Sequence, residues 1–307
     1  MHQLAVKTKN LKKSYGNFDA ISGLDLNIDA GEFFGLLGPN GAGKTTSIHM
    51  MSSLIKPTNG YAKIFGLDVT QQPVEVRRNI GLVFQDSVLD RQLSVWENLR
   101  FAGLLHNLNF NTIKNRANYL LELFGIFHKK NSPVVSLSGG QRRVIDIARG
   151  VMHEPKILFL DEPTIGLDLP TRRNIWRHIH QLRAKTGMTV LLTTHYLEEA
   201  ESCNRVAFLK NGNIVLNGNP RELVSQLACE IIEIETSEPE RVAEITKDLL
   251  GVALIEFETL FFKLEKKNNF NSAEILSNLK KELGLKVKRV LVRQPNLNDV
   301  FLWVNSK

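Results

Sequence analysis

The spacing of hydrophobic residues changes along this chain, and the changes separate candidate strands from candidate helices. Residues 4–37 alternate apolar and polar positions in short runs and end in a continuous apolar segment, which is typical of a strand buried on both faces. Three such buried strands are predicted, at 33–37, 157–160 and 189–193. Helix-compatible segments follow the first strand, from Thr45 to about Leu54, and separate the other two, at about 172–185. This alternation predicts an α/β core.

The region from about 87 to 150 lacks strong strand signals and carries helical spacing instead. The apolar positions that repeat at this spacing are Trp96, Leu99, Leu104, Leu105, Tyr119, Leu120, Leu123 and Phe124. We therefore expect a mostly helical subdomain inserted into the α/β core. A hairpin is predicted later, with strands at 206–209 and 213–216 joined by the turn Lys210-Asn211-Gly212.

The pattern changes again after Asn219-Pro220-Arg221-Glu222, and the last part of the chain predicts a separate α+β appendix. Its expected elements are a strand (231–236), a helix (239–250), two strands (253–265), a helix (272–283), a strand (286–293) and a short helix near 295–302 that Asn or Asp caps. We predict two domains: a core at 1–225, with the helical subdomain at about 87–150, and a C-terminal accessory domain at 229–307.

Composition and charge narrow the class of protein. The chain has 307 residues, 43% of them hydrophobic and 23% charged, which is enough to bury a large core. Its net charge is +7, but the basic residues are scattered, so a basic surface is expected rather than direct nucleic-acid binding. No segment resembles a membrane-spanning helix or a signal peptide, so we expect a cytosolic chain unless a partner holds it. Cys203 and Cys229 have no metal-ligand spacing and are expected to be reduced packing residues.

A phosphate-binding loop follows the first buried strand. The segment Gly38-Pro39-Asn40-Gly41-Ala42-Gly43-Lys44-Thr45-Thr46 fits the nucleotide-binding P-loop pattern at each required position. Its glycines let backbone N–H groups approach phosphate oxygens, and the N-terminus of the following helix adds positive potential. Lys44 is expected to reach the β- and γ-phosphates of ATP, Thr45 to place its hydroxyl on Mg²⁺, and Thr46 to support the loop or the α-phosphate.

Two adjacent carboxylates, Asp161 and Glu162, end the second buried strand. Ligands of open α/β sheets bind at the carboxyl ends of the strands, so Asp161 is expected near the metal of the P-loop. A solvated strand end is the alternative, and the buried strand before these residues argues against it.

The segment Leu137-Ser138-Gly139-Gly140-Gln141 precedes a helical run from Arg142 to Val151. On its own it is only a helix start, with backbone donors pointing from the N-terminus. Its order in the chain, after the P-loop and before the Asp161-Glu162 strand, resembles the ATP-binding cassette (ABC) ATPases, whose signature motif is Leu-Ser-Gly-Gly-Gln. The resemblance extends over about 4–220 and implies a P-loop NTPase core that binds ATP and Mg²⁺.

The resemblance assigns roles to single residues. It implies that Glu162 is the general base, that Ser138, Gly139, Gly140 and Gln141 reach the γ-phosphate of ATP held by a second subunit, and that Asp168 lies in a dimer-contact loop. Gln85 matches the glutamine that senses Mg²⁺ and the attacking water and contacts the membrane partner. His195 matches the histidine that holds the γ-phosphate, and Tyr15 the ring that stacks on adenine. Without the resemblance, Gln85 is an ordinary surface residue, His195 a loop histidine and Tyr15 a core aromatic.

Some positions depart from the family pattern. Ile165 stands where small residues are common, which puts detailed hydrogen bonding across the dimer in doubt. Val144 and Asp146 also differ from the residues frequent in the signature helix, although neither is expected to touch phosphate.

The function that this resemblance implies is the ATP-hydrolysing subunit of an ABC transporter. The appendix and its ending at Pro295–Leu302 resemble ABC-2-type export ATPases of the daunorubicin-resistance and Nod-factor-export types. The implied partners are a second cassette, in a homodimer or a heterodimer, and an integral-membrane permease that holds the chain at the inner face of the membrane. One alternative is a soluble ABC ATPase acting on ribosomes or nucleic acid, which usually needs two cassettes in one chain or coiled-coil arms. Another is a regulator that binds ATP without hydrolysing it, which the presence of both Asp161 and Glu162 disfavours.

Overall fold

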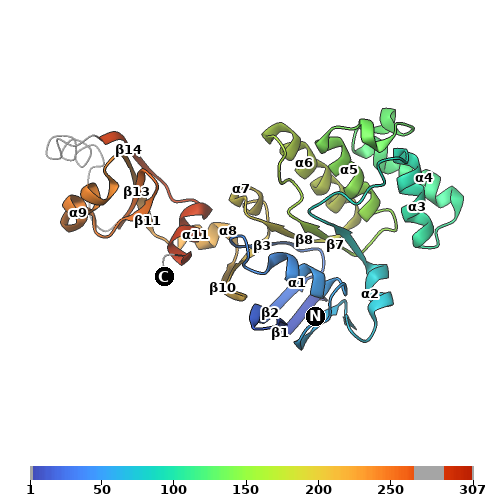
Figure 1. Cartoon of the computed structure of the whole chain (residues 1–307), viewed down its shortest axis with the longest axis horizontal. Coiled ribbons are helices and arrows are strands. Elements are labelled where there is room, and N and C mark those ends of the chain that lie inside the picture. The colour runs from blue at the N-terminus through green and yellow to red at the C-terminus, as the bar shows by residue number, and fades with distance from the viewer. Residues whose placement is uncertain (1–2, 266–286, 306–307) are drawn as a thin grey trace. The chain divides into compact units, whose positions relative to one another are not determined.

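The computed structural model of the protein describes residues 3–265 and 287–305, and they form two compact units that divide between residues 217 and 218 (Figure 1). The first unit contains a six-stranded sheet in the order β10-β9-β3-β8-β7-β6. Its strands are β3 (Phe33–Leu37), β6 (Ile80–Val83), β7 (Ile157–Asp161), β8 (Thr189–Thr194), β9 (Arg205–Lys210) and β10 (Asn213–Gly218). The strands from β9 to β6 run parallel, so their carboxyl ends share one edge.

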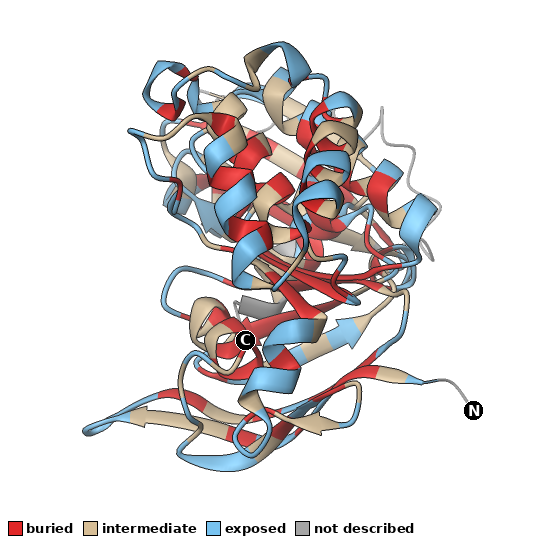
Figure 2. Ribbon diagram, turned by 90° about the vertical axis from the view of Figure 1, so that its right-hand side faces the viewer, coloured by how far each residue is buried: buried red, intermediate tan, exposed pale blue. Residues whose placement is uncertain are grey.

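The predicted continuous apolar strands are confirmed. Every residue of β3, β7 and β8 is buried, as the colouring of the central strands in Figure 2 shows. The strands β7 and β8 each run one residue further than predicted, to Asp161 and Thr194. The predicted hairpin is also present, and its turn residues Asn211 and Gly212 both have positive φ, 48° and 73°.

A second, antiparallel sheet of the first unit has the order β2-β1-β4-β5. Its strands are β1 (Leu4–Tyr15), β2 (Phe18–Asp29), β4 (Asn59–Ile64) and β5 (Leu67–Asp68). Helix α1 (Lys44–Met51) contacts both sheets, and its Ile48, Met50 and Met51 join the main hydrophobic core with side chains from each (Figure 1). This core fixes the start of α1, and therefore the phosphate-binding loop, against the carboxyl edge of the parallel strands.

The region from 87 to 150 is mostly helical, as predicted. It contains α3 (Val95–Leu105), α4 (Phe110–Leu123), two short 3₁₀ turns, η1 (Phe127–Lys129) and η2 (Val134–Ser136), and α5 (Gly139–Gly150). Ser94 and Glu97 form a capping box at the start of α3, and Asn109 caps α4 through the Thr112 amide. The hydrophobic pattern of the sequence did not predict helix α2 (Pro73–Asn79). This helix has seven residues and only one buried side chain.

Two helix boundaries differ from the prediction for local reasons. Helix α6 (Leu169–Thr186) begins three residues before the expected Arg172, because the Asp168 carboxylate caps the Thr171 amide and Pro170 fits the first turn. Helix α1 ends before the expected Leu54, since the chain turns at Ser53 with a φ of 62°. A further short helix, α7 (Leu197–Ala200), follows β8.

The second unit has its own antiparallel sheet, ordered β12-β13-β11-β14. Its described elements are α8 (Pro220–Ser225), β11 (Cys229–Thr236), α9 (Pro239–Leu250), β12 (Leu254–Glu256), β13 (Thr259–Glu265), β14 (Val287–Arg293) and α11 (Leu297–Asn305). Side chains of the sheet and α9 make a separate core around Ile232, Ile234 and Phe262. The sequence predicted these elements apart from α8, and the predicted helix at 272–283 lies outside the described residues.

Candidate active site

The phosphate-binding loop packs so closely on its surroundings that two of its positions accept only glycine. A Cβ on Gly38 would lie 2.3 Å from the carbonyl oxygen of Leu209, and one on Gly43 would lie 2.4 Å from Cδ1 of Ile21. Both residues also have positive φ, 155° and 103°. Gly43 stands at the N-cap of α1 and offers no side chain to its first turn, so the helix amides are left for a ligand.

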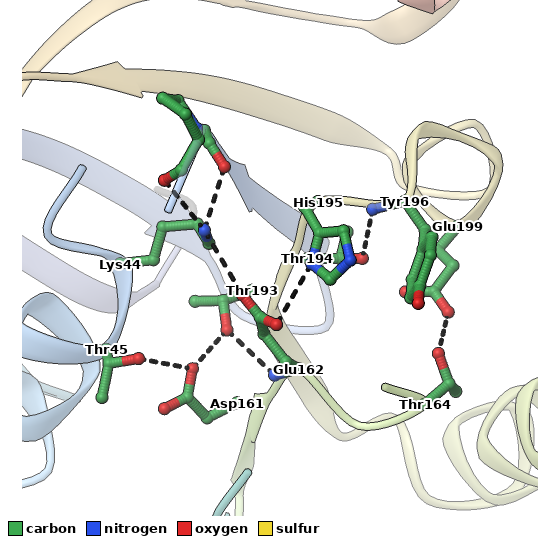
Figure 3. A network of polar contacts seen from close by, with 12 residues as sticks. Lys44, Thr45, Asp161, Glu162, Thr164, Thr193, Thr194, His195, Tyr196 and Glu199 are labelled. Atoms are coloured by element: carbon green, nitrogen blue, oxygen red, sulfur yellow. Dashed lines mark hydrogen bonds and ion pairs between the residues drawn. The ribbon is translucent and has the colours of Figure 1, made fainter. Parts of the chain in front are cut away.

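Lys44 is held inside the loop by three oxygen atoms (Figure 3). Its ammonium donates to the carbonyl of Gly38 at 2.9 Å and to that of Pro39 at 3.2 Å. It also pairs with Oε1 of Glu162 at 3.3 Å, and both side chains are less than 10% exposed. The charge of the lysine is therefore balanced by the glutamate at the end of β7.

Oxygen atoms from α1, β7 and β8 gather next to this pair. Oδ1 of Asp161 accepts hydrogen bonds from the Thr45 hydroxyl at 3.2 Å and the Thr193 hydroxyl at 2.5 Å (Figure 3). Carboxylate and hydroxyl oxygens are the ligands that Mg²⁺ takes in nucleotide-binding proteins. The donor set of Thr45 and Asp161 therefore fits the predicted metal.

Glu162 adopts a strained backbone conformation in the middle of the site. Its φ is 43°, in the left-handed region that costs a residue with a Cβ about 1–2 kcal/mol. Its amide donates to both the carbonyl and the hydroxyl oxygen of Thr193, each at 3.1 Å, which holds this conformation. Oε2 of its carboxylate lies 3.1 Å from Nδ1 of His195 (Figure 3). The two oxygens of one carboxylate thus contact Lys44 and His195.

A cavity of about 430 Å³ opens above the loop. The predicted site residues that line it are Tyr15, Asn40, Gly41, Gly43, Lys44, Thr45, Thr46, Gln85 and Glu162. Tyr15 is 52% exposed, so the alternative that it is a core aromatic is wrong. Of the other predicted residues, Asp161 and His195 reach the cavity-lining Thr45 and Glu162 through their own contacts.

Three further residues line the cavity and were not predicted to do so: Phe18, Ala20 and Ile165. Phe18 pairs with Tyr15 across the turn that joins β1 to β2 and is 62% exposed. The sequence signal that could have placed Phe18 beside Tyr15 is its position three residues later, across a tight turn. The cavity therefore has two aromatic side chains at its entrance rather than one.

The four signature residues Ser138 to Gln141 are outside this cavity. Ser138 caps α5 by accepting from the Gln141 amide at 3.2 Å, while its own amide donates to the Gln141 side chain at 3.0 Å. Gly140 is in close contact with α6, since a Cβ there would lie 2.4 Å from Cγ2 of Thr171. Ser138 and Gly139 are exposed, so the start of α5 presents a rigid, uncovered surface.

Two further histidines and the two cysteines have packing roles. His178 lies edge-on to the ring of Phe124, and His180 to the ring of Phe33, so the two point to different neighbours as expected. Burial lowers the pKa of both. The cysteines, Cys203 and Cys229, form no disulfide and are buried, and burial raises the pKa of the Cys203 thiol. Within the described ranges, no helix is long and apolar enough to cross a membrane.

Comparison with known proteins identifies relatives of this chain. Residues 21–165 match the family model described as "ABC transporter". The chain is 37% identical over 304 residues to a Nod factor export ATP-binding protein I of Cupriavidus metallidurans, covering 98% of this chain and 97% of that protein. It is 39% identical over 254 residues to the daunorubicin/doxorubicin resistance ATP-binding protein DrrA of Streptomyces peucetius, covering 81% of this chain and 77% of that protein.

Solved structures agree with the sequence matches. An ATP-binding cassette determined as a dimer in a post-hydrolysis state, bound to ADP and phosphate, superposes with a TM-score of 0.65 at 30% identity, over 70% of this chain and 98% of that one. CbiO1 of Clostridium perfringens, part of an ABC transporter complex, superposes with a TM-score of 0.67 at 29% identity, over 80% of this chain and 96% of that one. The phosphate loop, the carboxylates beside it and these relatives together show that the chain belongs to the ATP-binding proteins of ABC transporters, which are ATPases.

Proposed function

We propose that this chain is the ATP-hydrolysing subunit of an ABC-2-type exporter, and that it works as a homodimer or heterodimer of cassettes on a membrane permease. The observation that carries the proposal is the position of Glu162, whose carboxylate contacts both Lys44 and His195 beside the cavity. Relatives named for Nod factor export and for daunorubicin resistance align with nearly the whole chain, second unit included.

The residues that line the cavity favour one orientation of ATP. The uncapped N-terminus of α1 and the Lys44 ammonium supply positive potential for the phosphates at one end. The exposed ring of Tyr15 offers a stacking surface for adenine at the other, with Phe18 beside it. The close packing of Gly38 and Gly43 keeps the loop backbone near the phosphates.

Mg²⁺ would be held by Thr45 and Asp161, with Gln85 approaching from the cavity wall. When bound, the ion would supply positive charge that neutralises the phosphates. The Thr193 hydroxyl already fixes Asp161, so this carboxylate needs little rearrangement to serve as a ligand.

Glu162 acts as the general base in this proposal. Lys44 pairs with Glu162 at 3.3 Å, and the phosphates of ATP would compete for the same ammonium. Binding of ATP therefore frees Oε1 of Glu162 to accept a proton from the attacking water. His195 keeps its contact with Oε2, which holds the carboxylate in place, and its imidazole would hold the γ-phosphate.

A second chain completes the site. Ser138 is exposed and outside the cavity of its own chain, while the capping box fixes the start of α5. A head-to-tail partner would bring this helix N-terminus to the γ-phosphate of the first chain, and each chain would serve the other. The dimer then closes on ATP and opens after hydrolysis.

The permease is proposed to dock at an apolar groove between β6 and α3. This groove has a volume of about 460 Å³ and is lined mainly by apolar side chains, among them Leu54, Leu82, Phe84 and Leu105. Leu105 is 61% exposed, and Phe84 directly precedes Gln85. A cytoplasmic segment of the permease in this groove would sense the Gln85 segment and hold the chain at the inner face of the membrane.

Co-expression with a candidate permease tests the proposal. The wild-type chain should co-purify with the permease from membranes and hydrolyse MgATP, while Leu105→Glu should lose the permease and keep ATP binding, because a charge enters an apolar groove away from the nucleotide. Val215→Glu, which changes a 44% exposed apolar residue on β10, serves as the control and should keep both. Retention of the permease by Leu105→Glu would contradict the docking site. A wild-type chain without ATPase activity would contradict the proposed function.

A further inference from the structure

The buried face of the signature helix α5 carries two charged residues that the scheme above does not use, Arg143 and Asp146. They are three positions apart, and only 6% and 5% exposed. A buried charge is costly unless its surroundings compensate it, so the partners of these two residues indicate what they do.

Arg143 connects α5 to the ends of two neighbouring strands. Its guanidinium donates to the carbonyl oxygens of Phe84, after β6, and Pro163, after β7. It also donates to the carbonyls of Asp161 at 3.2 Å and Glu162 at 3.0 Å. A planar guanidinium with five N–H donors is the side chain that can serve four carbonyls at once. One side chain therefore contacts the segments that carry Gln85 and Glu162.

Asp146 holds the Gln85 segment from its other side. Oδ1 of Asp146 accepts a hydrogen bond from the amide of Val88 at 3.3 Å. Arg143 binds the chain one residue before Gln85, and Asp146 binds it three residues after. The segment that carries Gln85 is thus fixed to α5 at both ends.

Glu162 needs this support because its backbone is strained. Its φ of 43° is held from one side by Thr193, which accepts from the Glu162 amide, and from the other by Arg143, which donates to the Glu162 carbonyl. Without the Arg143 contact, the peptide after Glu162 is free to relax. The carboxylate would then move relative to Lys44 and His195.

We propose that Arg143 and Asp146 are positioning residues for ATP hydrolysis. They fix Gln85 and Glu162 to the same helix that presents Ser138 at its N-terminus. A displacement of α5 when a second chain engages Ser138 is therefore passed to both hydrolytic segments. This role rests on the proposed function of Gln85 and Glu162, and it assigns neither Arg143 nor Asp146 a contact with ATP.

The test compares Arg143→Lys, Asp146→Ala and Asp146→Asn in the full chain, with its permease where the wild type needs it. Misplacing the hydrolytic groups by about 1 Å should lower kcat on the order of 10²-fold in Arg143→Lys and Asp146→Ala. The KM for ATP and the ATP affinity should stay within about threefold of wild type, because no phosphate contact is lost. Asp146→Asn keeps an acceptor for the Val88 amide and should restore most of kcat.

Arg116→Gln is the matched control. Arg116 is also a largely buried arginine of the helical subdomain, and it donates to the Val151 carbonyl at 3.1 Å and pairs with Glu154 at 2.7 Å. Its loss should lower the unfolding temperature without changing kcat. If folded Arg143→Lys and Asp146→Ala keep the wild-type kcat, or lose ATP binding in step with kcat, the positioning role is wrong. If the wild-type chain hydrolyses no ATP, the proposed function itself is wrong. The ATPase rate of the wild type therefore distinguishes failure of the proposed function from failure of the positioning role.

Discussion

The buried pair of Lys44 and Glu162 makes a quantitative prediction about nucleotide affinity. At 3.3 Å the gross attraction between the two charges is about 5 kcal/mol for an effective dielectric constant of about 20. Glu162→Gln removes the negative charge but leaves an oxygen that still accepts from Lys44, which also keeps the Gly38 and Pro39 carbonyls. We therefore expect the nucleotide-free variant to be less stable than wild type by about 2 kcal/mol, below the 3–5 kcal/mol for breaking a buried pair outright.

Nucleotide binding should offset this loss of stability, because the phosphates replace the missing negative charge beside Lys44. In wild type the phosphates displace Glu162 from Lys44, whereas in the variant they meet no competitor. About 2 kcal/mol corresponds to roughly 30-fold tighter binding in Glu162→Gln. The assay is a titration with ADP, which avoids dimer closure on ATP, together with urea unfolding of the nucleotide-free proteins. Glu154→Gln, which changes the 66% exposed carboxylate of the Arg116 pair, is the control and should alter neither quantity by more than about 1 kcal/mol. Equal ADP affinity and equal stability in wild type and Glu162→Gln would refute the reasoning.

Three other predictions concern binding, acid stability and the second unit. Lys44→Ala should weaken ATP binding, since it removes the ammonium that faces the phosphates, and unchanged affinity in a nucleotide titration would be evidence against the P-loop assignment. Burial lowers the pKa of His153 to about 4, with the stacked ring of His106 adding to the effect, so the folded state keeps this ring neutral. As the pH falls, this ring takes up its proton in the unfolded chain before it does so in the folded chain. The contribution of His153 to the free energy of unfolding is therefore fully present above pH 6.5 and falls by up to about 3 kcal/mol as the pH drops toward 4. His153→Gln should flatten this slope in urea unfolding between pH 7 and 4.5, and an unchanged slope would show that other groups cause it. Removal of residues 229–307 should leave nucleotide affinity within about threefold of wild type, because each unit has its own core; loss of binding would show that the core needs the second unit.

The parts of the fold that the sequence predicted are those whose signals are local. The continuous apolar runs of β3, β7 and β8 indicate burial on both faces, and the loop from Gly38 to Thr46 carries its chemistry in contiguous residues. The apolar pattern predicts the start of α6 three residues late, because the cap at Asp168 and Pro170 in the first turn outweigh the polar residues there. Helix α8, six residues long, was missed because so few residues carry no periodic pattern.

The contacts around Glu162 could not be predicted in the same way. Arg143 reaches the Phe84 carbonyl across 59 positions of sequence, and only the packing of α5 against the strand ends brings them together. No signal in the sequence predicts the left-handed conformation of Glu162, since glutamate has no preference for it. Asp146 was noted only as a departure from the family pattern, and its contact with the Val88 amide gives that departure a physical role.

The central claim is that two chains complete each other's sites, and the oligomeric state of Glu162→Gln tests it most directly. With MgATP this variant should elute from size-exclusion chromatography as a dimer, because nucleotide binds and is not hydrolysed. It should elute as a monomer without nucleotide, and addition of Ser138→Arg should restore the monomer by blocking the exposed start of α5. A Glu162→Gln chain that stays monomeric at saturating MgATP, or a dimer that persists with Ser138→Arg, would contradict the head-to-tail arrangement.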